Sequence, residues 1–379
     1  MPDTMSVRKG VSRHADARMA VAELRSAIEQ PETRLVIFYC ARSFDREVLA
    51  SCMKQAFPDV CVIGCTTAGE ITPEGYLGGT LTGVSFAGHE LDVAATAIAL
   101  NPIDSLAAGD AVDALVRGMG LRHGLPPNGT DTFAYVLADG MSMQEEALVS
   151  VTHSHLHGIE LVGGSAGDDT EFGKTWVYWQ GEFQREMAAL VLVRTGHPFK
   201  VFRTQHFVHS DMRMVVTRAD PASRRVFEIN GLPAAPEYAR LIGLDVAELT
   251  PLVFATHPVV VRIGGQYFVR SVAYVKEDDS LQFFCAIDEG VVLTIAKGVD
   301  LVENLRNAFA DVRESIGNPM VVLGCDCLLR RLEIQRDGIE DQVGRIFRDN
   351  EVVGFTTYGE QINAMHVNQT FTGIAIGHA

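Results

Sequence analysis

The chain has 379 residues, of which 47% are hydrophobic and 21% are charged, and its formal net charge is −16. These proportions are typical of a soluble globular protein with room for two or three domain cores. The negative charge argues against binding to nucleic acid or to an anionic membrane surface, because both need clustered Lys and Arg.

Targeting and redox features are consistent with a cytoplasmic protein. No apolar run approaches the roughly 18–20 residues of a transmembrane helix, and the N-terminus lacks the apolar core of a signal peptide. The seven cysteines are an odd number in mostly apolar runs, which favours reduced, buried thiols over disulfides. No CxxCH motif is present, which excludes a covalently attached c-type haem.

The first half of the chain predicts two tandem β-α-β-β-β units. Apolar residues at helical spacing predict helices at 13–30, 46–57, 105–119 and 142–156, the second of them capped by Asp45. Predicted strands lie at 35–40, 60–65, 80–87, 91–99, 132–137, 160–162, 175–179 and 187–193. Gly196 and Pro198 mark the expected end of a first domain, residues 1–195.

The second half, residues 196–379, predicts a second domain. Strands are expected at 200–208, 214–217, 225–229, 259–263, 266–275 and 281–286, with a short helix at 236–243. A third copy of the unit is expected to follow, with helices at 301–316 and 340–349 and strands at 320–324, 352–355 and 370–376. The predicted class is α/β (mixed α+β), with mixed sheets, outer helices and a four-layer α-β-β-α packing as one arrangement.

Three loops repeat one phrase of strand, Gly, hydroxyl residues, Gly and carboxylate. They lie at 64–70, 163–168 and 354–360, and the repetition indicates one supersecondary unit used at least three times. Their ligand candidates are Thr66, Thr67, Glu70, Asp168, Thr356, Thr357 and Glu360. Such loops either face a ligand with free N–H and hydroxyl groups, or form tight turns whose carboxylates satisfy nearby backbone donors.

No catalytic motif stands out, so an enzyme is not expected. Three histidines are candidates to supply the neutral imidazole that ligates the iron of a b-type haem in an apolar cavity. The first candidate is His206, which shares a predicted strand face with Phe202 and Thr204. The second is His366, which follows the third loop, and the third is His257. Taken singly, each such histidine is more often a hydrogen-bonded core residue than a haem ligand. Arg270, Arg330 and Arg331 are candidates to pair with haem propionates or a ligand carboxylate.

Several stretches resemble the FIST sensory domains over nearly the whole chain. They read ADGMSMQEEALVSV (138–151), LVGGSAGDDTEFGKTWVYWQGE (161–182) and VVGFTTYGEQ (352–361). FFCAIDEGVVL (283–293), LGCDCLLRRLE (323–333) and MHVNQTFTGIAIG (365–377) are similar to the stand-alone FIST haemoproteins that sense nitric oxide, the NosP type.

The resemblance implies a FIST-N-like domain, a FIST-C-like domain and a sensor without catalysis. It further implies a b-type haem that binds nitric oxide and a partner histidine kinase in the cytoplasm, within a two-component system linked to cyclic-di-GMP and biofilm control. A homodimer is one arrangement open to such a receptor. One competing hypothesis is a FIST module that binds a small polar metabolite, such as an amino acid, through the three loops. Another is an uncharacterised enzyme that uses the same cleft.

Overall fold

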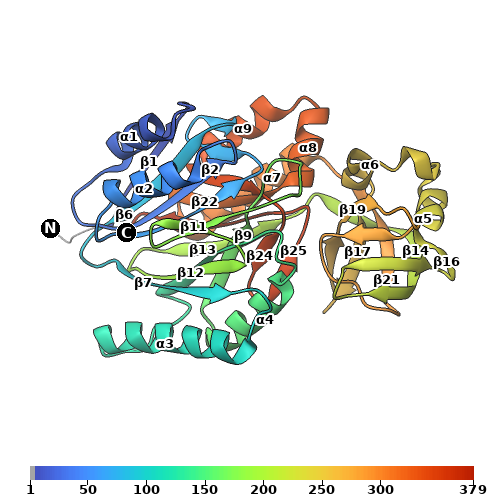
Figure 1. The fold of residues 1–379 in the computed structure, drawn as a ribbon, viewed down its shortest axis with the longest axis horizontal. Helices are drawn as coiled ribbons and strands as arrows, with labels where there is room; N and C mark the ends of the chain where they lie inside the picture. Colours follow the sequence, from blue (N-terminus) through green and yellow to red (C-terminus); the bar gives the residue numbers. More distant parts are fainter. Residues whose placement is uncertain (1–4) are drawn as a thin grey trace.

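A computed structural model describes residues 5–379 and shows three similar α/β units and one inserted β-rich domain (Figure 1). The first unit contains β1 (Ser6–Ser12), α1 (Ala17–Ile28), β2 (Thr33–Ala41), α2 (Arg46–Ala56), β3 (Cys61–Thr67), β4 (Glu70–Thr72), β5 (Gly75–Leu77) and β6 (Leu81–Ala87). The second contains β7 (Asp92–Ala99), α3 (Ser105–His123), β8 (Thr132–Ala138), α4 (Glu145–His155), β9 (Glu160–Ser165), β10 (Val177–Trp179), β11 (Glu182–Gln184) and β12 (Met187–Arg194).

The third unit is interrupted after its first strand. It contains β13 (Phe199–Thr204), α7 (Leu301–Ile316), β22 (Pro319–Cys327), α8 (Leu328–Arg336), α9 (Glu340–Asp349), β23 (Val352–Thr357), β24 (Glu360–Ile362), β25 (Met365–Val367) and β26 (Phe371–Gly377). Between β13 and α7 lies the inserted domain.

The short hairpin of each unit pairs with the edge of another unit's sheet. The three sheets run β1-β6-β2-β3-β10-β11, β7-β12-β8-β9-β24-β25 and β13-β26-β22-β23-β4-β5. In every sheet the two central strands are parallel, and the hairpin from elsewhere in the chain pairs antiparallel with the second of them. This exchange is cyclic, so the three units form one pseudo-threefold body.

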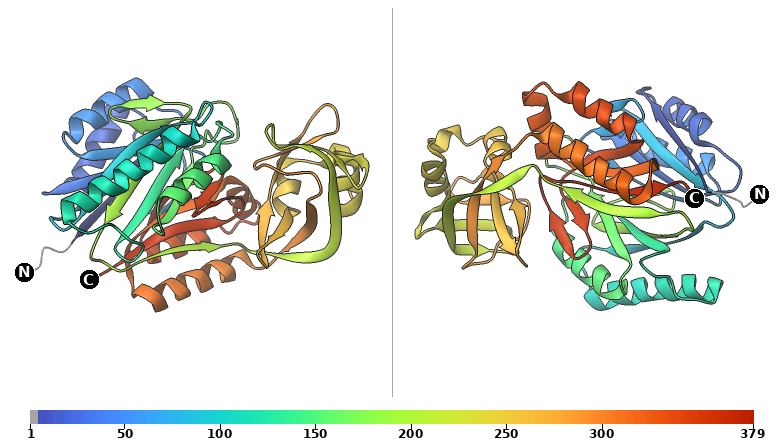
Figure 2. Two further views of the ribbon diagram at one scale, coloured as in Figure 1. Left: turned by 90° about the horizontal axis from the view of Figure 1, so that it is seen from below. Right: turned by 180° about the vertical axis from the view of Figure 1, so that it is seen from behind.

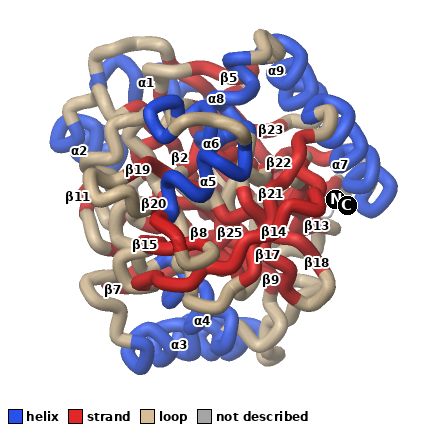
Figure 3. The backbone as a smooth tube through the Cα atoms, turned by 90° about the vertical axis from the view of Figure 1, so that its right-hand side faces the viewer, coloured by secondary structure: helices blue, strands red, loops and turns tan. Residues whose placement is uncertain are grey.

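The three sheets enclose a common core, and their helices lie outside. Apolar inner faces of all three sheets meet in one cluster that includes Ile37, Leu137 and Leu323. The outer faces pack under α1 and α2, under α3 and α4, and under α7 and α9. Viewed from the side of the inserted domain, these helix groups occupy three separate corners of the molecule (Figure 3).

The predicted mixed sheets with outer helices are confirmed. The predicted cap of the second helix is also confirmed, since the Asp45 carboxylate accepts the Val48 N–H at 3.1 Å. The four-layer packing is wrong. Cyclic exchange of hairpins joins three sheets around one core, whereas four layers would pair only two.

The inserted domain has its own core and its own antiparallel sheet. Its elements are β14 (Phe207–Asp220), β15 (Arg225–Ile229), β16 (Leu232–Pro233), α5 (Ala234–Ile242), the 3₁₀ turn η1 (Val246–Glu248), α6 (Pro251–Thr256), β17 (Val259–Ile263), β18 (Gln266–Arg270), β19 (Val272–Val275), β20 (Leu281–Phe283) and β21 (Val292–Gly298). The predicted turn at Gly264 and Gly265 joins β17 to β18 with both residues at positive φ.

The inserted domain forms a separate lobe beside the three-unit body (Figures 1 and 2). The two segments that connect the three-unit body to the inserted domain lie side by side, because the Val299 N–H donates to the His206 carbonyl at 2.7 Å. We call this the hinge. The division predicted at residue 195 falls between β12 and β13, and hairpin pairing crosses it in both directions.

Candidate functional site

The three repeated loops meet at one end of the three-unit body. Their backbones form a cyclic set of hydrogen bonds, Ala68 N to Thr356 O (3.0 Å), Gly167 N to Thr66 O (3.0 Å) and Tyr358 N to Ser165 O (3.2 Å). The three loops are therefore structurally equivalent, as the repeated phrase predicts, and this contact end is where the inserted domain approaches.

The loop glutamates are used inside the protein. Glu70 accepts hydrogen bonds from the hydroxyls of Thr67 and Thr80 and from the Thr80 N–H at 3.0 Å. Glu360 repeats this pattern with Thr357 and with Thr370, whose hydroxyl lies at 2.7 Å. Both carboxylates are buried, and burial raises the pKa of Glu360 to about 8. This geometry matches the tight-turn interpretation of these loops.

The second loop departs from this pattern. Asp168 accepts N–H groups from Gly173 (2.9 Å) and Lys174 (2.8 Å) and the hydroxyl of Tyr358. In this unit the backbone N–H of Glu186, just before the last strand, donates to the Asp139 carboxylate at 2.6 Å and not to the loop carboxylate. Asp139 was missed by the sequence reasoning, although its position directly before Gly140 at a strand end is a turn signal.

The remaining loop threonines also serve the turns. Thr66 accepts the Trp176 N–H at 3.1 Å through its hydroxyl, and Thr356 lies 3.4 Å from the Arg331 guanidinium. Arg331 donates chiefly to the carbonyls of Ala68 (2.9 Å) and Leu77 (3.2 Å). The loop candidates therefore come together, but their polar groups mostly face one another.

His206 lies at the hinge, in a buried polar chain. The strand predicted at 200–208 is interrupted at this residue, because β13 ends at Thr204 and β14 begins at Phe207. Burial lowers the pKa of this imidazole, although Glu333 raises it. Arg330 donates a hydrogen bond to His206 Nδ1 at 2.9 Å. His206 Nε2 therefore carries the ring proton and donates it to the Glu333 carboxylate at 2.8 Å.

Arg330 extends this chain into the core. It is fully buried and donates to Asp326 at 2.7 Å, and Asp326 also accepts the Tyr76 hydroxyl. Burial raises the pKa of Asp326, against the effect of Arg330. Arg330 is thus committed to an internal ion pair and to the hinge histidine.

His366 is buried between the second unit and the inserted domain. Gln361 donates to its Nδ1 at 3.2 Å, and its Nε2 therefore donates to the Phe284 carbonyl at 3.3 Å. Burial lowers the pKa of His366, against the raising effect of Glu146 and Glu145. Arg270 lies nearby, with Nη1 3.5 Å from the His366 carbonyl.

His257 ends α6 in the inserted domain and is half-buried. Its Nδ1 lies 3.3 Å from the Val253 carbonyl and 3.0 Å from the Thr256 hydroxyl. Donation from Nδ1 leaves Nε2 as the basic nitrogen, and no hydrogen bond of the described residues engages it.

An apolar cavity of about 570 Å³ lies between the loop end of the three-unit body and the inserted domain. We call it the interdomain cavity. One wall comes from the second-unit loop and α8, and the other from α6, β19 and the segment after β20. Its lining residues are Thr170, Phe172, Thr250, Pro251, Leu252, Ala273, Phe284, Leu329, Leu332 and Arg336. Phe284 connects it to His366, whose Nε2 donates to the Phe284 carbonyl.

The inserted domain is fixed over this end by buried charges. Arg224, with its side chain 6% exposed, pairs with Glu145 (2% exposed) and with Glu146 at the start of α4. Glu146 also accepts the Ala286 N–H at 2.8 Å. Gln369 adds two hydrogen bonds across the same boundary, from Ser271 and to the Ala255 carbonyl. Together these contacts hold the inserted domain against the three-unit body.

Two of the three candidate histidines do not fit a haem as they lie. His206 and His366 each use one ring nitrogen as donor and the other as acceptor, so ligating iron would break a buried hydrogen bond. None of five cavities found in residues 5–379 is lined by a histidine. Within the same residues, no group of three or more His, Cys, Asp or Glu is placed to hold a metal ion.

The cysteines are free thiols. Cys325 lies in the common core, 3.7 Å from the Tyr135 hydroxyl, and burial raises its pKa. No helix within residues 5–379 has the length and apolar character to cross a membrane.

Comparisons with known proteins match both halves of the chain. The FIST N domain family matches residues 34–232, and the FIST C domain family matches residues 234–363. The uncharacterized protein MJ1623 of Methanocaldococcus jannaschii is 23% identical over 364 residues, which cover 85% of this chain and 69% of that protein.

Two solved structures of cyanuric acid hydrolase align over nearly the full length. The one from A. caulinodans has a TM-score of 0.39 at 8% identity and covers 98% of this chain and 99% of its own. The other has a TM-score of 0.38 at 8% identity, with coverage of 99% and 100%. Likeness at this level supports no argument about fold or function.

Proposed function

The chain belongs to the FIST family of sensory domain proteins, and from that premise we propose that it is a receptor for a small ligand bound in the interdomain cavity. The observation that carries the proposal is the cavity itself, an apolar pocket between the inserted domain and the end where the three loops meet. Apolar pockets with a few polar groups at their rim are the usual form of small-molecule sites. The proposal includes no catalysis.

The ligand signal would pass through α8. One face of this helix, with Leu329 and Leu332, lines the cavity. Its other face, with Arg330 and Glu333, holds His206 at the hinge. A ligand that shifts α8 would therefore change the hydrogen bonds of Arg330 and Glu333 to His206, and with them the orientation of the inserted domain. A helix that contacts both the cavity and the hinge provides the physical link that a sensor needs to report binding at a distance.

A cavity-filling substitution tests where the ligand binds. The probe is 8-anilinonaphthalene-1-sulfonate, an aromatic anion that becomes fluorescent in apolar surroundings. We expect one saturable site on the full chain and loss of that site in Leu332→Trp. Leu121→Trp is the matched control, because Leu121 is 86% exposed on α3. Equal binding by all three proteins would remove the cavity from the proposal.

Nitric oxide sensing through a b-type haem, with output to a histidine kinase, stays a prediction from the resemblance. The visible spectrum of protein titrated with haem tests it directly. A stoichiometric Soret band that moves with nitric oxide would support it, and a protein that takes up no haem would remove it. Among the histidine variants, His257→Ala is the first to compare, because the basic nitrogen of His257 is not engaged by the described hydrogen bonds.

The metabolite hypothesis also makes a distinct prediction. It requires thermal stabilisation by an amino acid or small anion that is lost in Glu360→Ala. Because Glu360 already accepts hydrogen bonds from Thr357 and Thr370, we expect this variant to be less stable even without ligand. Comparing the ligand-induced rise in Tm, rather than Tm itself, separates the two effects.

A further inference from the structure

One buried tyrosine of residues 5–379 differs from the others in its hydroxyl. The others use theirs inside the protein: Tyr39 with Tyr135 at 2.7 Å, Tyr238 with the His257 carbonyl, and Tyr358 with Asp168. The hydroxyl of Tyr178, a residue that is 1% exposed, is engaged by no hydrogen bond among the described residues. Because buried tyrosine hydroxyls usually have a partner, this one is open to a partner from outside the chain.

The Tyr178 ring is held in place on β10 by two aromatic neighbours. Its centroid lies 5.1 Å from that of Phe38 and 5.5 Å from that of Phe183, and both pairs meet edge to face. Burial raises the pKa of Tyr178 to about 12, so the hydroxyl keeps its proton and is a donor at neutral pH. The position therefore holds one fixed and unused hydrogen-bond donor.

Tyr178 lines a cavity of about 580 Å³ at the start of β3, which we call the β3 cavity. Its walls come from the end of α2, from β3, from β10 and from β7 of the second unit. They are largely apolar and include Phe57, Val60, Val62, Ala95 and Trp179. The β3 cavity therefore combines an apolar interior with a buried donor.

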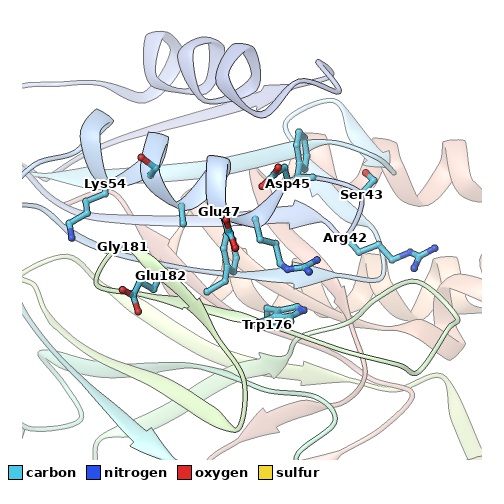
Figure 4. Close-up of a pocket in the computed structure, with 13 residues that line it drawn as sticks. Arg42, Ser43, Asp45, Glu47, Lys54, Trp176, Gly181 and Glu182 are labelled. Atoms are coloured by element: carbon cyan, nitrogen blue, oxygen red, sulfur yellow. The ribbon is translucent and has the colours of Figure 1, made fainter.

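Charge does not select the ligand of this cavity. Its charged side chains are Lys54 and Asp59, which are exposed and opposite in sign. Lys54 and Gly181 also line a larger groove of about 1080 Å³ along α2 (Figure 4). The cations of that groove are matched in number by carboxylates, with Arg42, Arg46 and Lys54 against Asp45, Glu47 and Glu182. What distinguishes the β3 cavity from this groove is its unused buried donor.

We propose that the β3 cavity binds an uncharged apolar molecule that carries a carbonyl oxygen or a similar hydrogen-bond acceptor. Its apolar body would contact Phe57 and Trp179, and its acceptor would take the hydrogen bond of the Tyr178 hydroxyl. Apolar walls with a few placed polar groups are the usual composition of a small-molecule site. The β3 cavity shares no lining residue with the interdomain cavity, so this second site does not depend on the first.

The unused hydroxyl makes a prediction for the protein without ligand. Because its removal breaks no hydrogen bond, Tyr178→Phe should keep the Tm of the wild type or raise it. Tyr39→Phe, which deprives the buried Tyr135 hydroxyl of its partner, should lower the Tm. An equal loss in both variants would show that the Tyr178 hydroxyl is already paired, and would overturn the proposal.

Two probes that differ only in the acceptor test the ligand class. The ketone α-tetralone carries one carbonyl on the bicyclic skeleton of the hydrocarbon tetralin. Ligand-observed NMR titrations of the full chain give a dissociation constant for each probe. The Leu332→Trp background removes any contribution of the interdomain cavity. The variants are Tyr178→Phe and, as the matched control, Tyr274→Phe on β19, where the tyrosine is 43% exposed.

We expect Tyr178→Phe to weaken the binding of α-tetralone by about fivefold, which corresponds to one net hydrogen bond. Tetralin should bind this variant and the wild type equally, and Tyr274→Phe should match the wild type with both probes. Val60→Trp, which fills the β3 cavity, should weaken both probes. Equal binding of α-tetralone by wild type and Tyr178→Phe, or no saturable binding of either probe, would overturn the proposal.

Discussion

At the scale of single residues, the buried carboxylate of Glu360 predicts a pH-dependent stability. Its pKa rises from 4.5 to about 8, chiefly through burial, although Thr357 and Thr370 oppose the rise. The folded state therefore keeps a proton that the unfolded state releases above pH 4.5. The stabilisation is full below that pH and is lost as pH rises towards 8, by up to about 1.4 kcal/mol per pH unit.

Glu360→Gln removes this titration while keeping a hydrogen-bonding side chain. We expect the Tm of the variant, relative to wild type, to rise steadily between pH 5 and pH 8. Glu314→Gln, which changes an exposed carboxylate, should run parallel to wild type. Thermal unfolding across that range is the measurement, and a parallel profile for Glu360→Gln would contradict the assignment.

A second residue-scale prediction concerns Arg224. Arg224→Met leaves Glu145 buried without its cation, which should cost about 3–5 kcal/mol. The neighbouring Arg225→Met is the matched control, because Arg225 pairs with the exposed Asp278 and should cost about 0–1 kcal/mol. Denaturant unfolding measures both variants. Adding Glu145→Gln to Arg224→Met should recover part of the loss, and equal effects of the two single variants would be inconsistent with a buried ion pair.

At the scale of elements, the first glycine position of the repeat is where neighbouring strand backbones approach closely. An added Cβ at Gly354 would lie 1.8 Å from the Gly324 carbonyl oxygen, and one at Gly163 would lie 1.9 Å from the Val136 carbonyl oxygen. We expect Gly354→Ala to destabilise the protein by about 3 kcal/mol. Gly118→Ala in α3 meets no atom within 4 Å and should be neutral or stabilising by up to about 1 kcal/mol. Comparing the two midpoints in denaturant tests this.

Elements with strong local signals were predictable from the sequence, and those defined by distant partners were not. Asp45 with the apolar spacing after it, and the Gly264–Gly265 turn, carry their own local signals. The strands of the hairpins β4–β5 and β24–β25 have only three residues each, and the strands that they pair with, β23 and β9, lie in other units. The helix α8 starts directly from β22 without a side-chain cap, so nothing local marks it.

The candidate site shows the same division. The inward orientation of His206 was predicted from its neighbours on the expected strand, and the structure confirms that its side chain is buried. His366, predicted as a candidate from its place after the third loop, is buried as well. Their partners Arg330, Glu333 and Phe284 lie 82 to 127 residues away along the chain. Whether a buried imidazole keeps a lone pair for a metal depends on those partners. Spacing along the sequence could not reveal it.

At the scale of the whole molecule, the cyclic exchange of hairpins makes the three units depend on one another. A fragment of residues 1–195 would lose β24 and β25 from the second sheet and would leave β4 without its partner β23. It would also lose the third wall of the common core. We expect this fragment to lack a cooperative unfolding transition, which calorimetry or denaturant titration would show.

The inserted domain predicts the opposite outcome. Its two crossings meet at the hinge, where Val299 N lies 2.7 Å from the His206 carbonyl oxygen, and its core is separate from that of the three units. Replacing residues 206–299 by a short Gly-Ser linker should therefore leave a body that unfolds cooperatively, although burial lost around Arg330 and Glu145 lowers its Tm. Cooperative folding of residues 1–195 alone, or collapse of the body without the insert, would mean that the units are not joined by exchange as the pairing indicates.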